Sequence, residues 1–227
     1  MQSIRAITFD LDDTLWDIGL VIERAERETY QWLSTYCPRA TAKFSIAEMQ
    51  QVRTNIVDEY PQHSHDLSHL RWLAFEKILS AAGYGSSQVD QVFEEFMTLR
   101  NTVEFFPDAL PALERLSQVY PLASLTNGNA DLELIGIRHH FSATISARDH
   151  GVAKPHRDLF HAACEALECE PGEVLHIGDS PEHDVMGAVE AGLQAVWLNR
   201  HGHPWELPCP AGIEVSDLDE LLRLLDL

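Results

Sequence analysis

Lysine is scarce in this chain of 227 residues, which contains only Lys43, Lys77 and Lys154. Lysine and arginine together number 16 against 36 aspartates and glutamates, so the formal net charge is −20. A charge of this sign and size disfavours nucleic acid and anionic membrane surfaces as partners. Any site for a phosphate group therefore needs a local positive charge or a metal ion.

Cysteine is also sparse, and the four cysteines form no CxxC pair, which fits a reducing compartment. No apolar run approaches the length of a membrane span. The first residues lack the basic and apolar pattern of a signal peptide. We therefore expect a cytoplasmic protein, a monomer or a homodimer, with no membrane and no nucleic-acid partner.

The most informative stretch that is present lies near the start of the chain. Residues 4–9 are mostly apolar and β-branched, which predicts a short buried strand. Asp10, Asp12 and Asp13 follow at once, at the carboxyl end of that strand, where ligands bind in open parallel sheets. Taken alone, the same residues are equally consistent with a solvated turn and a helix cap.

The rest of the chain divides into a helical part and an alternating part. Apolar spacing predicts helices and no strand between residues 16 and 105, at 16–36, 45–60, 67–82 and 87–103. Ser45 and Glu48 form a capping-box pattern at the start of the second of these helices. From Pro107 onward, predicted strands at 120–125, 143–146, 174–177 and 193–198 alternate with predicted helices at 108–117, 129–135, 158–167, 183–191 and 218–225.

This alternation predicts an α/β fold with a doubly wound parallel sheet, interrupted after its first strand by an all-helical insert. We expect residues 1–15 and 106–227 to form the α/β core and residues 16–105 to form the insert. Asp108 is predicted to cap the helix that ends at Ser117, and Asn129 is predicted to open the next helix. Residues 201–210, with three prolines, are predicted to be a loop.

Three of the predicted strands end in small polar or acidic residues that would meet at one edge of the sheet. These residues are Asp10, Asp12 and Asp13; Thr126, Asn127 and Gly128; and Gly178, Asp179 and Ser180, with Asp184 one helical turn further on. Clustered carboxylates repel one another unless a hard cation lies among them, and Mg²⁺ suits such oxygen ligands. Lys154, which precedes Pro155 and a predicted helix, could supply the missing positive charge.

Taken together, these four motifs resemble those of the haloacid dehalogenase-like hydrolase superfamily. Asp10-Leu11-Asp12-Asp13-Thr14, Thr126-Asn127-Gly128, Ala153-Lys154-Pro155 and Gly178-Asp179-Ser180 with Asp184 appear in the expected order. The helical insert resembles the type C1 cap of that superfamily. The resemblance covers essentially the whole chain and implies a Mg²⁺-dependent hydrolase with a Rossmann-like core.

The resemblance also implies a role for each acidic residue. Asp10 would be the nucleophile that forms an aspartyl-phosphate. Asp12 would protonate the leaving group and then activate water. Asp10, the backbone carbonyl of Asp12 and Asp179 would hold Mg²⁺, while Asp184 would orient the water molecules bound to the metal. Asp184 read by itself is also consistent with an acid favoured by a helix N-terminus.

Three further residues are implied to bind the phosphoryl group. Thr126 and Asn127 would hydrogen-bond it during transfer, and Lys154 would neutralise its charge and that of Asp10. Lys154 could instead be a solvated surface residue. The histidines at 63, 65, 69, 139 and 140 match no zinc-site spacing, which favours polar loop histidines.

The sequence leaves several reactions open. Phosphatases of the superfamily carry an acid at position 12 and its dehalogenase branch does not, so we expect a phosphomonoesterase acting on a small phosphate ester. A haloacid dehalogenase and a phosphosugar mutase are the alternatives. A phosphonate-cleaving enzyme would need a cap lysine, and only Lys43 or Lys77 could serve. A non-catalytic scaffold is disfavoured because four site residues are all present: Asp10, Asp12, Lys154 and Asp179.

Finer details point toward one branch of the phosphatases. Asp10 to Asp17, Leu125 to Asn129 and His176 to Asp179 resemble the corresponding segments of bacterial phosphatases in the riboflavin pathway. Those enzymes act on 5-amino-6-(5-phosphoribitylamino)uracil and on flavin mononucleotide (FMN). The resemblance therefore implies one of these esters as the substrate.

Overall fold

The computed structural model describes residues 3–208 and 212–227. Cys209 and Pro210, at the end of the loop predicted for residues 201–210, lie outside the described residues. The chain forms two compact units. One contains Met1–Asp17, Glu104–Gly128 and Gly136–Leu227, and the other contains Ile18–Val103 and Asn129–Ile135. No described helix has the length and apolar composition that crossing a bilayer requires.

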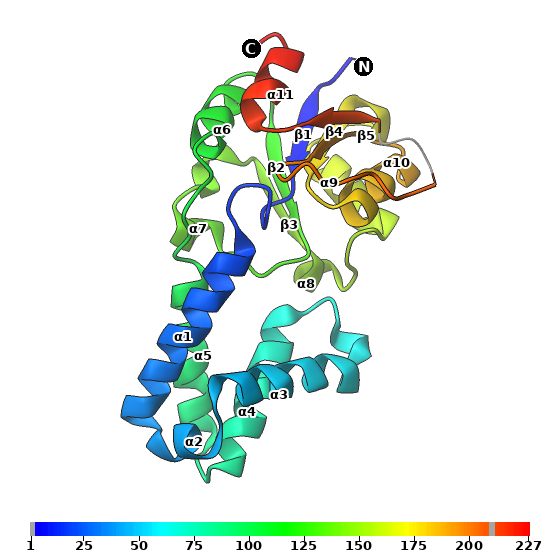
Figure 1. The fold of residues 1–227 in the computed structure, drawn as a ribbon. Helices are drawn as coiled ribbons and strands as arrows, with labels where there is room; N and C mark the ends of the chain where they lie inside the picture. Colours follow the sequence, from blue (N-terminus) through cyan, green and yellow to red (C-terminus); the bar gives the residue numbers. More distant parts are fainter. Residues whose placement is uncertain (1–2, 209–211) are drawn as a thin grey trace. The chain divides into compact units, whose positions relative to one another are not determined.

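The first unit is built on a parallel sheet of six strands in the order β3-β2-β1-β4-β5-β6 (Figure 1). The strands are β1 (Ala6–Phe9), β2 (Leu122–Thr126), β3 (Ala143–Ser146), β4 (Val174–Gly178), β5 (Gln194–Leu198) and β6 (Ile213–Val215). Every residue of β1, β2 and β4 is buried, which explains why these strands are continuous apolar runs rather than alternating ones. The predicted α/β class, with a helical segment inserted between β1 and β2, is confirmed.

Helices cover this sheet. They are α6 (Ala109–Ser117), α8 (Ala147–His150), α9 (Arg157–Ala166), α10 (Gly187–Glu190) and α11 (Leu218–Leu224). Figure 1 places α6 and α11 on one side of the strands and α9 and α10 on the other. Leu159 and Phe160 of α9 are fully buried against the central strands. Single-turn 3₁₀ helices at Arg138–His140 and Pro171–Glu173 complete the connections.

The predicted capping of α6 by Asp108 is wrong. The helix begins at Ala109 as expected, but the Asp108 side chain makes no cap hydrogen bond to it. The carboxylate instead accepts the backbone N–H of Leu218, at the start of α11, at 2.7 Å. It also pairs with Arg200 at 3.0 Å. The two partners come from distant parts of the chain, so local sequence could not reveal them.

Two other helix starts differ from the prediction. The helix predicted from His183 begins earlier, as a π-helical turn at Pro181–Met186 that continues into α10. The helix predicted from Asn129 is only α7 (Leu132–Ile135). Asp131 determines that start, because its carboxylate accepts the backbone N–H groups of Glu133 and Leu134.

The second unit consists mainly of helices around its own apolar core. They are α1 (Ile18–Tyr36), α2 (Pro38–Lys43), α3 (Ile46–Glu59), α4 (Leu67–Ala81), α5 (Ser86–Arg100) and α7, with a 3₁₀ turn at Pro61–His63. The capping box of Ser45 and Glu48 is confirmed at the start of α3. Leu33, Ile78 and Phe96 lie in the core. Arg71 is largely buried there, paired with Glu26 at 2.9 Å.

Candidate active site

Three carboxylates from two strand ends converge at the carboxyl edge of the sheet. Asp10 follows β1, Asp179 follows β4, and Asp184 lies in the π-helical turn after β4. One oxygen from each lies within 4.8 Å of the other two, and within residues 3–208 and 212–227 no other group of histidine, cysteine or acidic side chains gathers in this way. The histidines at 63, 65 and 69 therefore form no such group, although their rings lie near one another.

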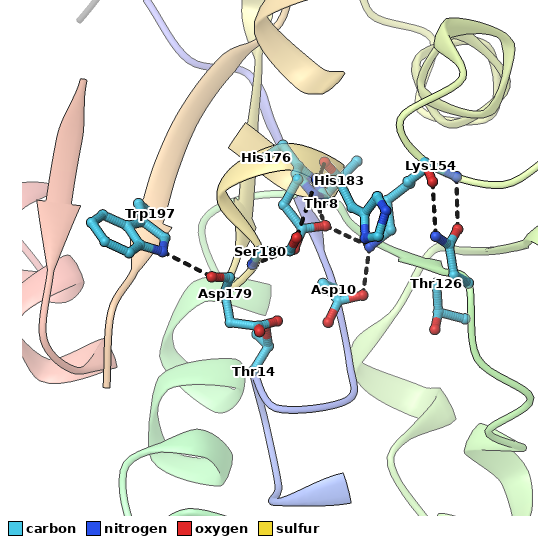
Figure 2. Close-up of polar contacts among 12 residues, drawn as sticks. Thr8, Asp10, Thr14, Thr126, Lys154, His176, Asp179, Ser180, His183 and Trp197 are labelled. Carbon is cyan, nitrogen blue, oxygen red and sulfur yellow. Dashed lines mark hydrogen bonds and ion pairs between the residues drawn. The ribbon is translucent and has the colours of Figure 1, made fainter. Parts of the chain in front are cut away.

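Lys154 lies between two of these carboxylates (Figure 2). Its Nζ atom donates to Asp10 Oδ1 at 2.5 Å and to Asp184 Oδ1 at 2.6 Å, and the residue is only 4% exposed. Asn127 holds the backbone of Lys154 by accepting its N–H at 2.7 Å and donating to its carbonyl at 3.0 Å. The side-chain amide of Asn127 thus fixes the loop that carries the lysine.

A buried histidine supports the cluster from inside the sheet. His176, in β4, lies beside Thr8 of β1 in the strand register, and its Nδ1 is 2.8 Å from Thr8 Oγ1. Its Nε2 is 3.1 Å from Asp184 Oδ1. The other oxygen of Asp184 accepts the backbone N–H of Ser180 at 2.9 Å. These contacts fix the orientation of Asp184.

Gly178 provides the space that Asp184 occupies. A Cβ atom at Gly178 would lie 2.3 Å from Asp184 Cγ, a separation that cannot occur without displacing the carboxylate. The glycine before Asp179 is therefore required by the close approach of a side chain.

Burial and neighbouring charges shift the pKa values of the site residues in different directions. Burial raises the pKa of Asp10 well above its ordinary value, although Lys154 opposes the shift. Burial and the charge of Asp184 raise the pKa of Asp179 to about 7. Burial would also raise the pKa of Asp184, but Lys154 and His176 outweigh it and hold that pKa well below its usual range. Burial likewise opposes the charge of Lys154, but Asp10 and Asp184 raise its pKa. Asp184 and Lys154 therefore form the ionised pair.

The remaining predicted site residues lie at the same edge. Thr126, the last residue of β2, accepts the backbone N–H of Gly128 on its hydroxyl oxygen at 2.9 Å. Asp12 does not belong to the three-carboxylate group, and its Oδ1 accepts the indole N–H of Trp16 at 2.8 Å. Thr14 lies at the same edge, and its hydroxyl donates to Asp179 Oδ1 at 3.4 Å.

Sequence reasoning did not assign Thr8, His176 or Trp16 to the site. Thr8 and His176 are polar residues inside fully buried strands, and that contrast is the signal that could have identified them. The helix predicted for residues 16–36 includes Trp16, but α1 begins only at Ile18. Trp16 belongs instead to the loop after β1.

The donor set fits a hard divalent cation. Asp10 and Asp179 offer carboxylate oxygens, and no nitrogen or sulfur ligand belongs to the group. Mg²⁺ and Ca²⁺ prefer oxygen ligands, and Mg²⁺ uses few from the protein and keeps several water molecules. A cation here would offset both the burial and the carboxylate repulsion that raise the pKa of Asp179.

The two other lysines lie in the helical unit. There, Lys43 contacts Ala81 and Lys77 contacts Glu59.

The chain is similar to known proteins over nearly its whole length. Residues 4–192 match the family model described as haloacid dehalogenase-like hydrolase. The chain is 32% identical to the 5-amino-6-(5-phospho-D-ribitylamino)uracil phosphatase YigB of Escherichia coli, over 98% of this chain and 96% of YigB.

Two solved structures are similar along the whole chain. A crystal structure of a 2-haloacid dehalogenase from Pseudomonas syringae has a TM-score of 0.90 and 33% identity, covering 98% of both chains. The HAD hydrolase YfnB of Bacillus subtilis, crystallised with magnesium, has a TM-score of 0.71 and 21% identity, covering both chains fully. The second likeness concerns the fold alone.

Proposed function

The chain belongs to the haloacid dehalogenase-like hydrolase family, and on that premise we propose that it is a Mg²⁺-dependent phosphomonoesterase. The observation that carries this proposal is the presence of a second carboxylate, Asp12, two residues after the candidate nucleophile Asp10. Hydrolysis of a phosphate ester needs an acid for the leaving alkoxide and a base for water, and one carboxylate can serve as both.

In the first step, an oxygen of Asp10 attacks the phosphorus atom and the ester P–O bond breaks. Asp12 gives its proton to the departing alkoxide, which leaves as the alcohol. The product on the enzyme is an aspartyl-phosphate, which splits one difficult displacement into two easier ones. The burial of Asp10 beside Lys154 supports this role, because a charged donor there stabilises the developing negative charge.

In the second step, Asp12 takes a proton from a water molecule whose oxygen attacks the same phosphorus atom. The bond to Asp10 breaks and inorganic phosphate leaves. Asp10, Asp179 and the backbone carbonyl of Asp12 would hold the cation, which supplies charge neutralisation at the phosphoryl oxygens when bound. Asp184 would orient its water molecules, a role supported by the bonds that fix both of its oxygens.

The phosphoryl group would be held by Thr126 and Lys154. Asn127 would contribute partly by positioning the loop that carries Lys154, because its amide nitrogen and oxygen both hydrogen-bond the backbone of Lys154. We further propose that residues 1–15 and 106–227 form the catalytic core and residues 16–105 the cap, and that the enzyme is cytoplasmic.

For the substrate we propose FMN or another phosphate of the riboflavin pathway. This is supported by the likeness to YigB, which extends over nearly the whole of both chains. Direct assays with these esters test the substrate.

Phosphate release from a panel of phosphorylated metabolites tests the proposal. We expect wild-type protein with Mg²⁺ to release phosphate, with FMN and the ribitylaminouracil phosphate among the better substrates. Chelation of the metal and the Asp10→Asn change should each abolish release. Equal release by wild type and Asp10→Asn would overturn the mechanism, and a profile limited to sugar phosphates would overturn the substrate. Isomerised sugar phosphate without free phosphate would indicate a mutase.

Haloacid dehalogenation is the second candidate, because the Pseudomonas protein with 33% identity is described as a 2-haloacid dehalogenase. The same preparations should be assayed for halide release from 2-chloropropionate without added metal. We expect none, because Asp12 provides an acid that the dehalogenase branch lacks. Halide release in the absence of phosphate release would establish the dehalogenase instead.

A further inference from the structure

The side chain of Asp12 is held from two sides by residues with no assigned role. On one side, the indole Nε1 of Trp16 donates to Asp12 Oδ1 at 2.8 Å. On the other side, a Cβ atom at Gly128 would lie only 2.2 Å from Asp12 Oδ2. The carboxylate therefore lies between an indole N–H and the bare Cα of a glycine.

Trp16 is itself fixed in place. Its side chain is fully buried, and its ring meets Phe105 edge to face with the centroids 5.7 Å apart. Its backbone carbonyl accepts the N–H of Asp13 at 2.8 Å, and Trp16 and Phe105 form an antiparallel bridge. An indole anchored in this way cannot follow Asp12 if the carboxylate turns away, so it defines one position for that side chain.

We propose that Trp16 is a positioning residue that selects which oxygen of Asp12 carries the transferable proton. This inference rests on the proposed function, in which Asp12 is the acid and base. An indole N–H can only donate, so the oxygen that it contacts must accept. Oδ1 is thereby kept as an acceptor in both protonation states of Asp12.

The proton consequently lies on Oδ2 when Asp12 acts as the acid, and Oδ2 takes the proton from water when Asp12 acts as the base. Oδ2 is the oxygen that lies over Gly128, beside the Thr126–Gly128 loop proposed to bind the phosphoryl group. Gly128 is required for this arrangement because any side chain there would displace Oδ2. No proton passes to or from the indole in either step.

The test uses Trp16→Phe, which keeps an aromatic ring in the core and removes the N–H donor together with part of the indole ring. We expect kcat for an alkyl phosphate to fall about tenfold to a hundredfold, since misplacing a catalytic group by about 1 Å costs up to about a hundredfold. KM should be unchanged. The loss should be smaller for an aryl phosphate, whose leaving group needs less protonation, a difference that a merely structural defect would not produce.

A double-mutant cycle assigns the effect to Asp12. In the Asp12→Asn background, Trp16→Phe should cause no further loss, because the proton that it positions is absent. Multiplying losses would overturn the inference. The matched control is Trp72→Phe, which removes an indole N–H from an exposed bond to Asp90 and should leave kcat unchanged.

Two further measurements keep the outcomes distinct. Thermal unfolding shows whether Trp16→Phe has a folding defect. If it does, the second variant is Gly128→Ala, which crowds Oδ2 of Asp12 without opening a cavity and should reproduce the loss of kcat. Unchanged kcat in folded Trp16→Phe, with wild type active and Asp12→Asn strongly slowed, overturns this inference alone. An inactive wild-type protein, or full activity in Asp12→Asn, overturns the proposed function instead.

Discussion

At the scale of single residues, Lys154 compensates the same negative charge as a bound cation would. It neutralises Asp10 and Asp184 in the absence of a cation, since its Nζ contacts both carboxylates in a buried setting. A bound divalent cation would satisfy the same negative charge. Lys154 and a cation therefore both compensate the negative charge of the carboxylate cluster. Removing one of them should make the stability of the protein depend more on the other.

The Lys154→Met change should separate these effects. We expect phosphate release to fall at least about a hundredfold, because the phosphoryl group loses its nearest cationic donor. Without metal, the variant should lose about 3–5 kcal/mol of unfolding free energy, because two buried carboxylates are left without their partner. Mg²⁺ should then raise its melting temperature more than that of wild type, measured by thermal unfolding with and without the metal.

A surface lysine provides the control. Lys77 pairs with Glu59 where both side chains are about half exposed, so Lys77→Met should alter neither stability nor the response to Mg²⁺. An equal Mg²⁺ shift in wild type and Lys154→Met would contradict the idea that lysine and cation compensate the same charge.

The pKa of Asp179 predicts how metal affinity depends on pH. Burial and Asp184 raise this pKa to about 7, so below that pH a proton must leave Asp179 before its carboxylate can bind a cation. The dissociation constant for Mg²⁺ should therefore increase as pH falls below about 7, by up to about tenfold per pH unit, and level off above it.

Titration calorimetry across this pH range provides the measurement. Asp179→Asn should bind Mg²⁺ weakly and lose most of the pH dependence, since the titrating group is gone. Tighter Mg²⁺ binding at lower pH in wild type would contradict the assignment of Asp179 as a ligand.

Sequence reasoning identified Asp10 and Asp179 because each directly follows a buried apolar strand, and it identified Asp12 and Asp184 from their spacing to these two residues. It missed the pair of Thr8 and His176 because these residues meet only through the register of β1 against β4. It missed the bond between Trp16 and Asp12 because an aromatic residue next to apolar ones is typical of a core position. The roles of Thr8, His176 and Trp16 depend on tertiary contacts that the sequence does not reveal.

At the scale of elements, most strongly patterned segments were predictable, but several short ones were not. The predicted strand at 143–146 coincides with β3, and α3, α4 and α11 lie within one residue of the predicted limits. β6, with three residues, and α2 and α8, with six and four, were not predicted. Segments this short contain too few residues to establish a period, and their structure depends on packing.

Arg200 shows how one residue joins several elements. Its guanidinium pairs with both oxygens of Asp108, at the start of α6, and donates twice to the backbone carbonyl of Thr14 in the loop after β1. Asp108 in turn accepts the first N–H of α11. The arginine therefore connects the loop that carries Asp12 to two helix starts.

The Arg200→Met change should lower the free energy of unfolding by about 2–4 kcal/mol, because Asp108 is only 10% exposed and would lose its charged partner. Chemical denaturation provides the measurement. The pair of Arg5 and Glu173 is much more exposed, so Arg5→Ala should change stability by less than about 0.5 kcal/mol. Equal losses in the two variants would show that burial does not determine the strength of these pairs.

At the scale of the whole molecule, the net charge of −20 opposes the approach of a phosphate ester. Only three lysines are present, and one of them, Lys154, is buried at the site. Attraction of the ester by Lys154 therefore acts over a short range, whereas repulsion by the net negative charge acts over the whole surface. Long-range repulsion between like charges slows association and is weakened by salt. The short contacts within the buried site are screened much less.

Ionic strength should therefore act on substrate capture rather than on the chemical step. Between about 20 and about 200 mM NaCl at saturating Mg²⁺, kcat/KM for a dianionic ester should rise about twofold to fivefold while kcat stays constant. Steady-state kinetics with FMN provide the measurement, and sucrose at matched osmolality controls for viscosity and hydration. A fall in kcat/KM over the same range would mean that attraction by the site, rather than repulsion by the whole surface, governs how the substrate approaches.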